Sequence, residues 1–204
     1  MPMKSRPRIF SYKLSRDYGF APNPFHGVCT LATCKPQIRE GAQVGDIVVG
    51  CGSKAINLQE RMIFAMRVTE KLNFQQYWDD PRFSAKKASF DSSKSAAYGD
   101  NIYHFYEGQW LQEDSHHSYE GGVVNQLNFD RDLGSKNVLI SNDFIYWGDN
   151  APMIPIHLRQ FNQEDLYPNG RNYRSNYSNA FIDEVVDWFT KLPERGNRGR
   201  PKCW

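Results

Sequence analysis

The chain has 204 residues, of which 40% are hydrophobic and 14% aromatic, and its formal net charge is +2 at pH 7. A chain of this length can bury roughly 70% of its unfolded surface, so we expect one domain with a substantial core. The composition excludes the charge-rich, aromatic-poor pattern of disordered proteins, and no run approaches the roughly 18 apolar residues that a membrane helix needs.

The first third of the chain is predicted to form short strands separated by loops. Alternating side chains predict a strand over residues 8–14. The next segment, residues 17–25, is rich in glycine, proline and aromatic residues, so we expect it to fold back onto the domain. A short helix is predicted over residues 36–41, which start with proline and end with glycine. Residues 46–51 and 62–69 are predicted to form two adjacent strands.

The later part of the chain carries weaker signals until its last helix. Residues 73–83 are expected to be helical or irregular, and residues 84–99 are polar and small enough to predict a loop. An amphipathic helix over residues 179–192 places Phe181 and Val185 on one face, so it should pack on the sheet. Four further short strands are predicted over residues 102–105, 109–111, 137–140 and 144–147.

The charge is unevenly distributed along the chain. Five basic residues precede the first acidic one, and residues 191–204 hold five basic residues and one acidic residue. The remainder, residues 17–190, has 15 basic and 22 acidic side chains. This acidic balance argues against a broad duplex-binding face on the folded body, because duplex affinity depends on clustered Lys and Arg. The basic ends could still contact nucleic acid, and the alternative for residues 193–204 is a solvated, flexible tail.

The four cysteines, Cys29, Cys34, Cys51 and Cys203, form no CxxC pair and no zinc-knuckle spacing. Reduced thiols in a cytoplasmic protein are therefore expected, with no metal site. The basic start of the chain is not followed by an apolar signal-peptide core. The sequence also lacks a Walker-type loop, GxGxxG, HExxH and the zinc-deaminase signature, so no cofactor is predicted.

The segment over residues 17–39 has the composition of a binding loop, because it combines side-chain hydrogen-bonding groups with glycines that permit close backbone approach. For each residue taken alone, a structural role is the favoured interpretation. Cys29 and Cys34 could be small core residues, and His26 a hydrogen-bonded surface residue. The candidate ligand-binding residues of this segment are Asp17, Phe20, Asn23, Phe25, His26, Thr30 and Lys35.

The middle of the chain, residues 98–118, concentrates polar and aromatic side chains. Asp114, Ser115 and a histidine supply the residue types of a nucleophile relay, although adjacency in sequence does not establish the required geometry. If this run is a strand, His116 and His117 face opposite sides and make a poor metal pair. Hydrogen-bonded loop histidines are the structural alternative. The candidate ligand-binding residues here are Trp78, Asp100, Asn101, Tyr103, Trp110, Ser115, His116 and His117.

Three blocks together resemble a known family, nucleotide modification associated domain 2. They are residues 17–39, residues 45–53, and the series from residue 77 to residue 118. This family is associated with phage and bacterial systems that modify DNA bases, so the resemblance implies a role near modified nucleotides. A looser resemblance, over residues 9–70, is to the PUA, EVE and ASCH group, whose small barrels often hold a modified base in an aromatic cage.

These observations predict an α+β fold: a PUA-like (EVE/ASCH-like) small β-barrel with flanking helices and a C-terminal amphipathic helix. Residues 1–192 are expected to form one nucleotide modification associated domain, and residues 193–204 a flexible basic tail. The expected function is binding of a nucleotide or modified nucleobase in a nucleic-acid modification or phage-defence context. DNA is a further candidate partner through the basic termini, as are proteins of a modification or defence system; no membrane is expected.

An enzyme acting on a nucleotide or DNA base is the alternative function. In that case Cys29 would be the nucleophile, or Asp114 and His116 would be the acid and base. A third alternative is a subunit of a larger modification or defence complex. All of these hypotheses require the early loop, residues 17–35, and the twin histidines, His116 and His117, to line one cavity.

Overall fold

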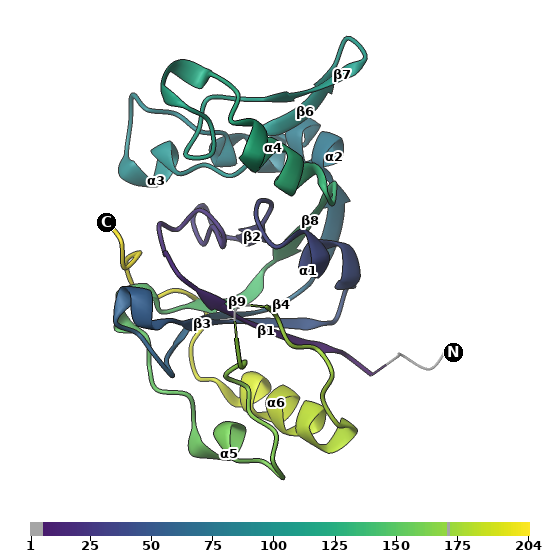
Figure 1. The fold of residues 1–204 in the computed structure, drawn as a ribbon, viewed down its shortest axis with the longest axis vertical. Coiled ribbons are helices and arrows are strands. Elements are labelled where there is room, and N and C mark those ends of the chain that lie inside the picture. The colour runs from purple at the N-terminus through teal and green to yellow at the C-terminus, as the bar shows by residue number, and fades with distance from the viewer. Residues whose placement is uncertain (1–5, 171) are drawn as a thin grey trace. The chain divides into compact units, whose positions relative to one another are not determined.

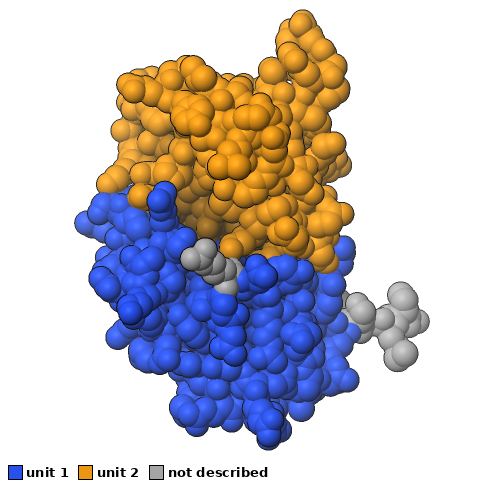
Figure 2. Space-filling model, in the orientation of Figure 1, with its two compact units in different colours: residues 1–17, 42–68, 143–204 blue, residues 18–41, 69–142 orange. Residues whose placement is uncertain are grey.

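The computed structural model describes residues 6–170 and 172–204, so the beginning of the basic N-terminal segment, including Lys4, lies outside the described residues. The chain divides into two compact units, coloured separately in Figure 2. Unit 1 comprises residues 1–17, 42–68 and 143–204, and unit 2 comprises residues 18–41 and 69–142. Each unit is therefore assembled from segments that are distant in sequence.

Unit 1 is built on a mixed five-stranded sheet in the order β1-β3-β4-β9-β10. The strand β1 (Ile9–Leu14) is parallel to β3 (Ile47–Gly52), and β3 is antiparallel to β4 (Met62–Arg67). In turn, β4 is antiparallel to β9 (Asp143–Tyr146), and β10 (Gly196–Asn197) lies parallel to β9. The strands are almost continuously buried, which explains their runs of Val, Ile, Met and Phe.

The helix α6 (Asn179–Lys191) packs against one face of this sheet (Figure 1). Ser178 caps its N-terminus by accepting a hydrogen bond from the Phe181 amide. Phe181, Val185 and Phe189 are 0% exposed and join the strands in one apolar core, as the predicted amphipathic pattern requires. The remaining helical turns of unit 1 are η1 (Lys54–Ile56), η4 (Gly148–Asn150) and α5 (Ile156–Arg159).

Unit 2 contains two smaller antiparallel sheets and its own aromatic core. One sheet has the order β2 (Cys29–Leu31), β8 (Asn137–Ser141), β5 (Glu70–Asn73). The other is the hairpin of β6 (Tyr103–Tyr106) and β7 (Gln109–Gln112), beside α2 (Phe74–Asp79) (Figure 1). The helices of unit 2 are α1 (Pro36–Gly41), α2 (Phe74–Asp79), η2 (Pro81–Lys86), α3 (Lys94–Ala97), η3 (Glu120–Gly122) and α4 (Gln126–Leu133).

The mixed α and β content agrees with the prediction, but the PUA-like barrel is not confirmed. In the part of the chain that the structure describes, the strands form three separate sheets and no closed barrel. The two predicted neighbours, β3 and β4, do pair, yet β1 joins β3 in parallel and the sheet remains open. Strand patterns fix which residues are extended, whereas closure depends on pairings between distant segments.

Two expectations from the sequence, the extent of the domain and its cytoplasmic location, stay predictions. The short strand β10 and its pairing with β9 lie within the basic segment that we expected to be flexible, and the extent of the domain remains an expectation. Across residues 6–170 and 172–204, each helix is too short or too polar to traverse a bilayer.

Candidate functional site

The early loop and the twin histidines meet within unit 2. The ring centroids of Tyr18 and His116 lie 4.7 Å apart, and Tyr18 also stacks on Tyr98 at 5.4 Å. Phe20 contacts both histidines, at 5.2 Å from the His116 ring and 4.5 Å from the His117 ring. Two stretches separated by about a hundred positions in the printed sequence therefore share one aromatic cluster.

A thiol, an imidazole and a carboxylate are arranged in series next to this cluster. Cys34 Sγ lies 3.7 Å from Nε2 of His117, and Nδ1 of the same ring lies 2.7 Å from Oδ2 of Asp132. Cys34 is partly exposed, whereas His117 and Asp132 are buried. The three residues come from the turn before α1, the turn after β7 and the helix α4.

The Asp132 carboxylate is held as an anion although it is 0% exposed. Tyr103 Oη donates a hydrogen bond to its Oδ2 at 3.0 Å, and the Cys34 amide donates to its Oδ1 at 2.8 Å. Burial alone would raise the pKa of this carboxyl, but the hydrogen bond from His117 and the charges of His117, Arg131 and Arg39 lower it. Asp132 is thereby able to stabilise a positive charge on the neighbouring ring.

The His117 ring is correspondingly basic. Burial lowers its pKa, but the hydrogen bonds with Asp132 and Cys34 outweigh burial and raise the pKa to about 9. An imidazole in this position can hold a proton on Nδ1 against Asp132 and exchange a proton with Cys34 through Nε2.

The backbone around Cys34 is held in an unusual conformation. Cys34 and Lys35 have φ values of 55° and 41°, in the left-handed region that non-glycine residues seldom adopt. The buried guanidinium of Arg39 fixes this turn, because its Nε donates to the Cys34 carbonyl at 2.7 Å. The same guanidinium donates to the carbonyls of Asp132 and Ser135, and so ties the turn to the end of α4.

The same three side chains also supply ligand atoms for a metal ion, since one atom from each lies within 4.8 Å of the other two. Cys and His are common zinc ligands. Cys34 Sγ contacts Nε2 of His117 and Asp132 Oδ2 contacts Nδ1, which is the order of contacts in a nucleophile relay. A metal ion would bind only one of the two ring nitrogens, so a relay and a metal site are alternative uses of the same three side chains.

A second buried polar cluster centres on Lys86. Its ammonium donates to the Asn23 and Val28 carbonyls at 2.9 and 2.8 Å, and to Thr30 Oγ1 at 3.2 Å. Thr30 in turn donates to Asp100 Oδ2 at 2.5 Å. Burial lowers the pKa of Lys86 to about 8 and raises that of Asp100. Through these hydrogen bonds with Asn23, Thr30 and Asp100, the cluster anchors the early loop within unit 2.

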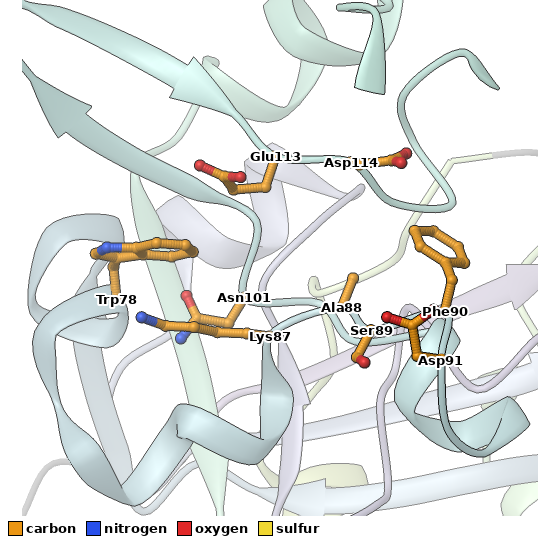
Figure 3. A pocket seen from close by; sticks show the side chains of 9 residues that line it. All are labelled: Trp78, Lys87, Ala88, Ser89, Phe90, Asp91, Asn101, Glu113 and Asp114. Atoms are coloured by element: carbon orange, nitrogen blue, oxygen red, sulfur yellow. The ribbon is translucent and has the colours of Figure 1, made fainter. Parts of the chain in front are cut away.

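Unit 2 also contains an open pocket of about 460 Å³, shown in Figure 3. Trp78 and Lys87 lie together at one part of its wall, and Phe90 and Asp91 lie at another (Figure 3). The full lining is Trp78, Lys87, Ala88, Ser89, Phe90, Asp91, Asn101, Glu113 and Asp114.

Both faces of the Trp78 indole are covered in this pocket. His104 stacks on it with ring centroids 4.2 Å apart, and the Lys87 ammonium lies 3.6 Å from the indole centroid. At these distances the two groups must occupy opposite faces. His104 Nε2 and Glu113 Oε1 are hydrogen-bonded at 2.6 Å, which fixes the stacked imidazole.

Asn101 is the pocket residue with an unmet hydrogen-bonding requirement. Its side-chain nitrogen donates to the Tyr77 carbonyl at 2.9 Å and to the Phe83 carbonyl at 3.4 Å. Its side-chain oxygen is buried and has no hydrogen-bond partner among the described residues. A buried acceptor of this kind can be satisfied by a ligand N–H group.

The remaining predicted residues are scattered. Asp17 lies in unit 1, where its carboxylate accepts hydrogen bonds from Tyr146 Oη at 2.6 Å and the Lys202 amide at 3.0 Å. Cys29 is 0% exposed, and burial raises its pKa to about 12, which disfavours it as a nucleophile. Ser115 is buried, and its Oγ accepts a hydrogen bond from the His117 amide. In the early loop, Phe25 contacts the exposed His26.

Sequence reasoning missed several residues of these clusters. Cys34 was treated as a core residue, and Asp132, Lys86 and Lys87 were not selected. Asp132 lies on a helix whose N-terminus is capped by Asn125, the side chain of which accepts a hydrogen bond from the Asn128 amide. That cap was the available sequence signal for α4, and an acid on the buried face of the helix would then have stood out.

Comparison with protein families gives one match. The model described as nucleotide modification associated domain 2 matches residues 6–204. This confirms the resemblance and extends it over the basic C-terminal segment, beyond the blocks that first indicated it. No curated protein and no solved structure was found to match the chain.

Proposed function

The chain belongs to the nucleotide modification associated domain 2 family, and on that premise we propose that unit 2 binds a nucleobase in the pocket of Figure 3. The family's name indicates involvement in nucleotide modification. Binding of a base, rather than of some other small molecule, is the finer statement that the pocket chemistry supports.

The unpaired oxygen of Asn101 is the observation that carries this proposal. A buried acceptor left without a partner costs roughly 1–3 kcal/mol, which a bound donor recovers. The exocyclic amino group of adenine, cytosine or guanine is such a donor, and an amide side chain is a recurrent partner for base edges. Asn101 is held rigidly, because its amide nitrogen is anchored to the Tyr77 and Phe83 carbonyls.

The charges of the pocket favour the base over the phosphate. Three carboxylates, those of Asp91, Glu113 and Asp114, face one ammonium, that of Lys87. The negative charge of these carboxylates attracts N–H donors and repels a phosphate group. We therefore place the base inside the pocket and leave the phosphate toward solvent.

Stacking would use the Trp78 face that Lys87 covers. A flat base on an aromatic side chain contributes about 1–3 kcal/mol, and the displaced ammonium remains free to approach a phosphate outside the pocket. The opposite face stays covered by His104, whose stacking keeps the indole in place. The exposed ring of Phe90, 55% accessible, offers a second apolar contact at the pocket wall.

Calorimetric titration with deoxynucleosides and their monophosphates tests the proposal. We expect at least one base to bind, with similar affinity as nucleoside and monophosphate, and Trp78→Ala to weaken binding about 5- to 150-fold. Trp188→Phe in unit 1 is the matched control and should bind normally. Absence of binding at millimolar concentrations, or unchanged affinity in Trp78→Ala, would contradict this assignment.

The biological setting also stays a proposal. A bacterial or phage system that modifies or defends DNA accounts for base recognition by this family, and contacts of DNA with the basic chain ends would place the base-binding unit near its polymer. Protein partners in such a system are expected on the same grounds.

A further inference from the structure

We infer that Cys34, His117 and Asp132 form a nucleophilic catalytic centre in unit 2 that transfers or hydrolyses acyl groups. This activity goes beyond base binding and does not depend on it, because no residue of the series lines the pocket of Figure 3. Cys34 is the nucleophile, His117 the general base and acid, and Asp132 the residue that orients the imidazole.

The order of contacts supports these roles. A nucleophile relay requires the nucleophile at one ring nitrogen and the orienting carboxylate at the other. The structure has Sγ of Cys34 at 3.7 Å from Nε2 and Oδ2 of Asp132 at 2.7 Å from Nδ1. The longer contact involves sulfur, and such contacts are often loose before substrate binds.

The environment of Cys34 separates it from the other thiols. Cys29 and Cys51 are 0% exposed, and burial raises the pKa of each to about 12. Cys34 and Cys203 are partly exposed, but Cys203 lies in unit 1 and accepts a hydrogen bond from the Asp17 amide. Cys34 therefore combines access to solvent with a basic imidazole, which reactive cysteines require.

The backbone supports the same conclusion independently. Two consecutive non-glycine residues with positive φ, Cys34 and Lys35, cost of order 1–3 kcal/mol each and persist only where surrounding contacts impose them. The contacts are present: the Cys34 amide donates to Asp132, and the Cys34 carbonyl accepts from Arg39. The carboxylate that orients His117 thus also positions the cysteine, so both sides of the relay are fixed by one side chain.

The reaction balances without a cofactor. In the neutral form of the His117 imidazole, which is populated as pH approaches about 9, Nε2 takes the thiol proton while Sγ of Cys34 attacks the carbonyl carbon of an ester or amide. Collapse of the tetrahedral adduct forms a thioester at Cys34, breaks the bond from the carbonyl carbon to oxygen or nitrogen, and passes the proton to the departing alcohol or amine. Water, deprotonated by His117, then attacks the thioester, releasing the acid and returning the proton to Cys34. An amine in place of water gives transfer.

The test uses the full chain with p-nitrophenyl acetate as the acyl donor, and follows nitrophenolate release together with the mass of the protein and its peptides. We expect one acetyl group on Cys34 and a burst that Cys34→Ser abolishes. His117→Asn should slow acylation by about 10²- to 10⁴-fold. Cys203→Ser is the matched control and should acylate at the wild-type rate. Thermal unfolding of each variant shows that it remains folded, and Asp132→Asn serves as a second variant in the relay.

Three outcomes would overturn the inference. The first is equal acylation of Cys34 and Cys203. The second is acylation of Cys34 at an unchanged rate in folded His117→Asn. The third is one zinc ion per chain that Cys34→Ser removes, since this would assign the three side chains to a metal site.

Discussion

The two units of the protein use their interiors differently. Of the sixteen buried polar or charged side chains among the described residues, three are in unit 1 (Ser11, Asp17 and Asp46) and thirteen are in unit 2. Unit 1 packs a helix on a sheet through aliphatic and aromatic side chains. Buried ionisable groups are costly and stabilise a fold poorly, so from their concentration in unit 2 we propose that this unit carries the chemistry.

Unit 2 itself contains two kinds of buried charge. The cluster of Lys86, Thr30 and Asp100 is buried, and the Lys86 ammonium donates hydrogen bonds to the Asn23 and Val28 carbonyls and to Thr30 Oγ1. The series from Cys34 to Asp132 ends instead at a partly exposed thiol. We interpret the first as the support of the early loop and the second as a reactive group positioned by that loop.

The largest expected effect on the free energy of unfolding comes from removing the buried charge of Lys86. Lys86→Met leaves the carbonyls of Asn23 and Val28 without this donor and Asp100 without a nearby cation, so we expect a loss of about 3–5 kcal/mol in unfolding free energy. Urea denaturation followed by circular dichroism measures it. A loss below about 1 kcal/mol, the size of a typical single hydrogen bond, would show that the cluster does not support unit 2.

A smaller effect, but one specific to the relay, is a pH dependence of stability. The pKa of His117 is about 9 in the folded protein, compared with about 6.5 for an unperturbed histidine, so the folded state binds the proton more tightly. Its contribution, roughly 3 kcal/mol, is complete below about pH 6.5 and is lost as pH rises to about 9. Denaturation of wild type and His117→Asn across this range should show a steeper decline in the wild type; parallel curves would refute the assigned environment.

The smallest expected effect on stability is that of a core substitution in unit 1, which is compared with the substitutions in unit 2. Ile145 is 2% exposed in the sheet core, and Ile145→Val should cost about 0.5–1.5 kcal/mol with the wild-type pH dependence between pH 6.5 and 9. The same denaturation series measures both quantities. A change in pH dependence as large as that of His117→Asn would remove the distinction between the two units.

Most of the regular structure was predictable from local patterns. The strands β1, β3 and β4 and the helix α6 follow from alternation, β-branched runs and the apolar face of a helix. The three-residue strand β2 was missed because its neighbours Asn23 and Ser141 pair with it across the sequence. Pairing between distant segments also determines whether a sheet closes into a barrel. Local strand patterns carry no information on this, which explains why a barrel was predicted and not confirmed.

The candidate site shows the same division. The functional hypotheses required the early loop and the twin histidines to lie together, and their rings do meet. Composition could not distinguish Cys29 from Cys34, which are five positions apart, because only the fold determines that the first is sealed and the second faces an imidazole. Asp132 is far from both in sequence; the Asn125 cap could have indicated its helix, but only the fold shows that its carboxylate faces His117.

Hydrogen-deuterium exchange with and without a millimolar mixture of the four deoxynucleosides tests the central claim most directly. The account predicts slower exchange in residues 78–91 and 101–114 of unit 2, around the pocket of Figure 3, and unchanged exchange in unit 1. Protection confined to unit 1, or no protection in either unit, would contradict it.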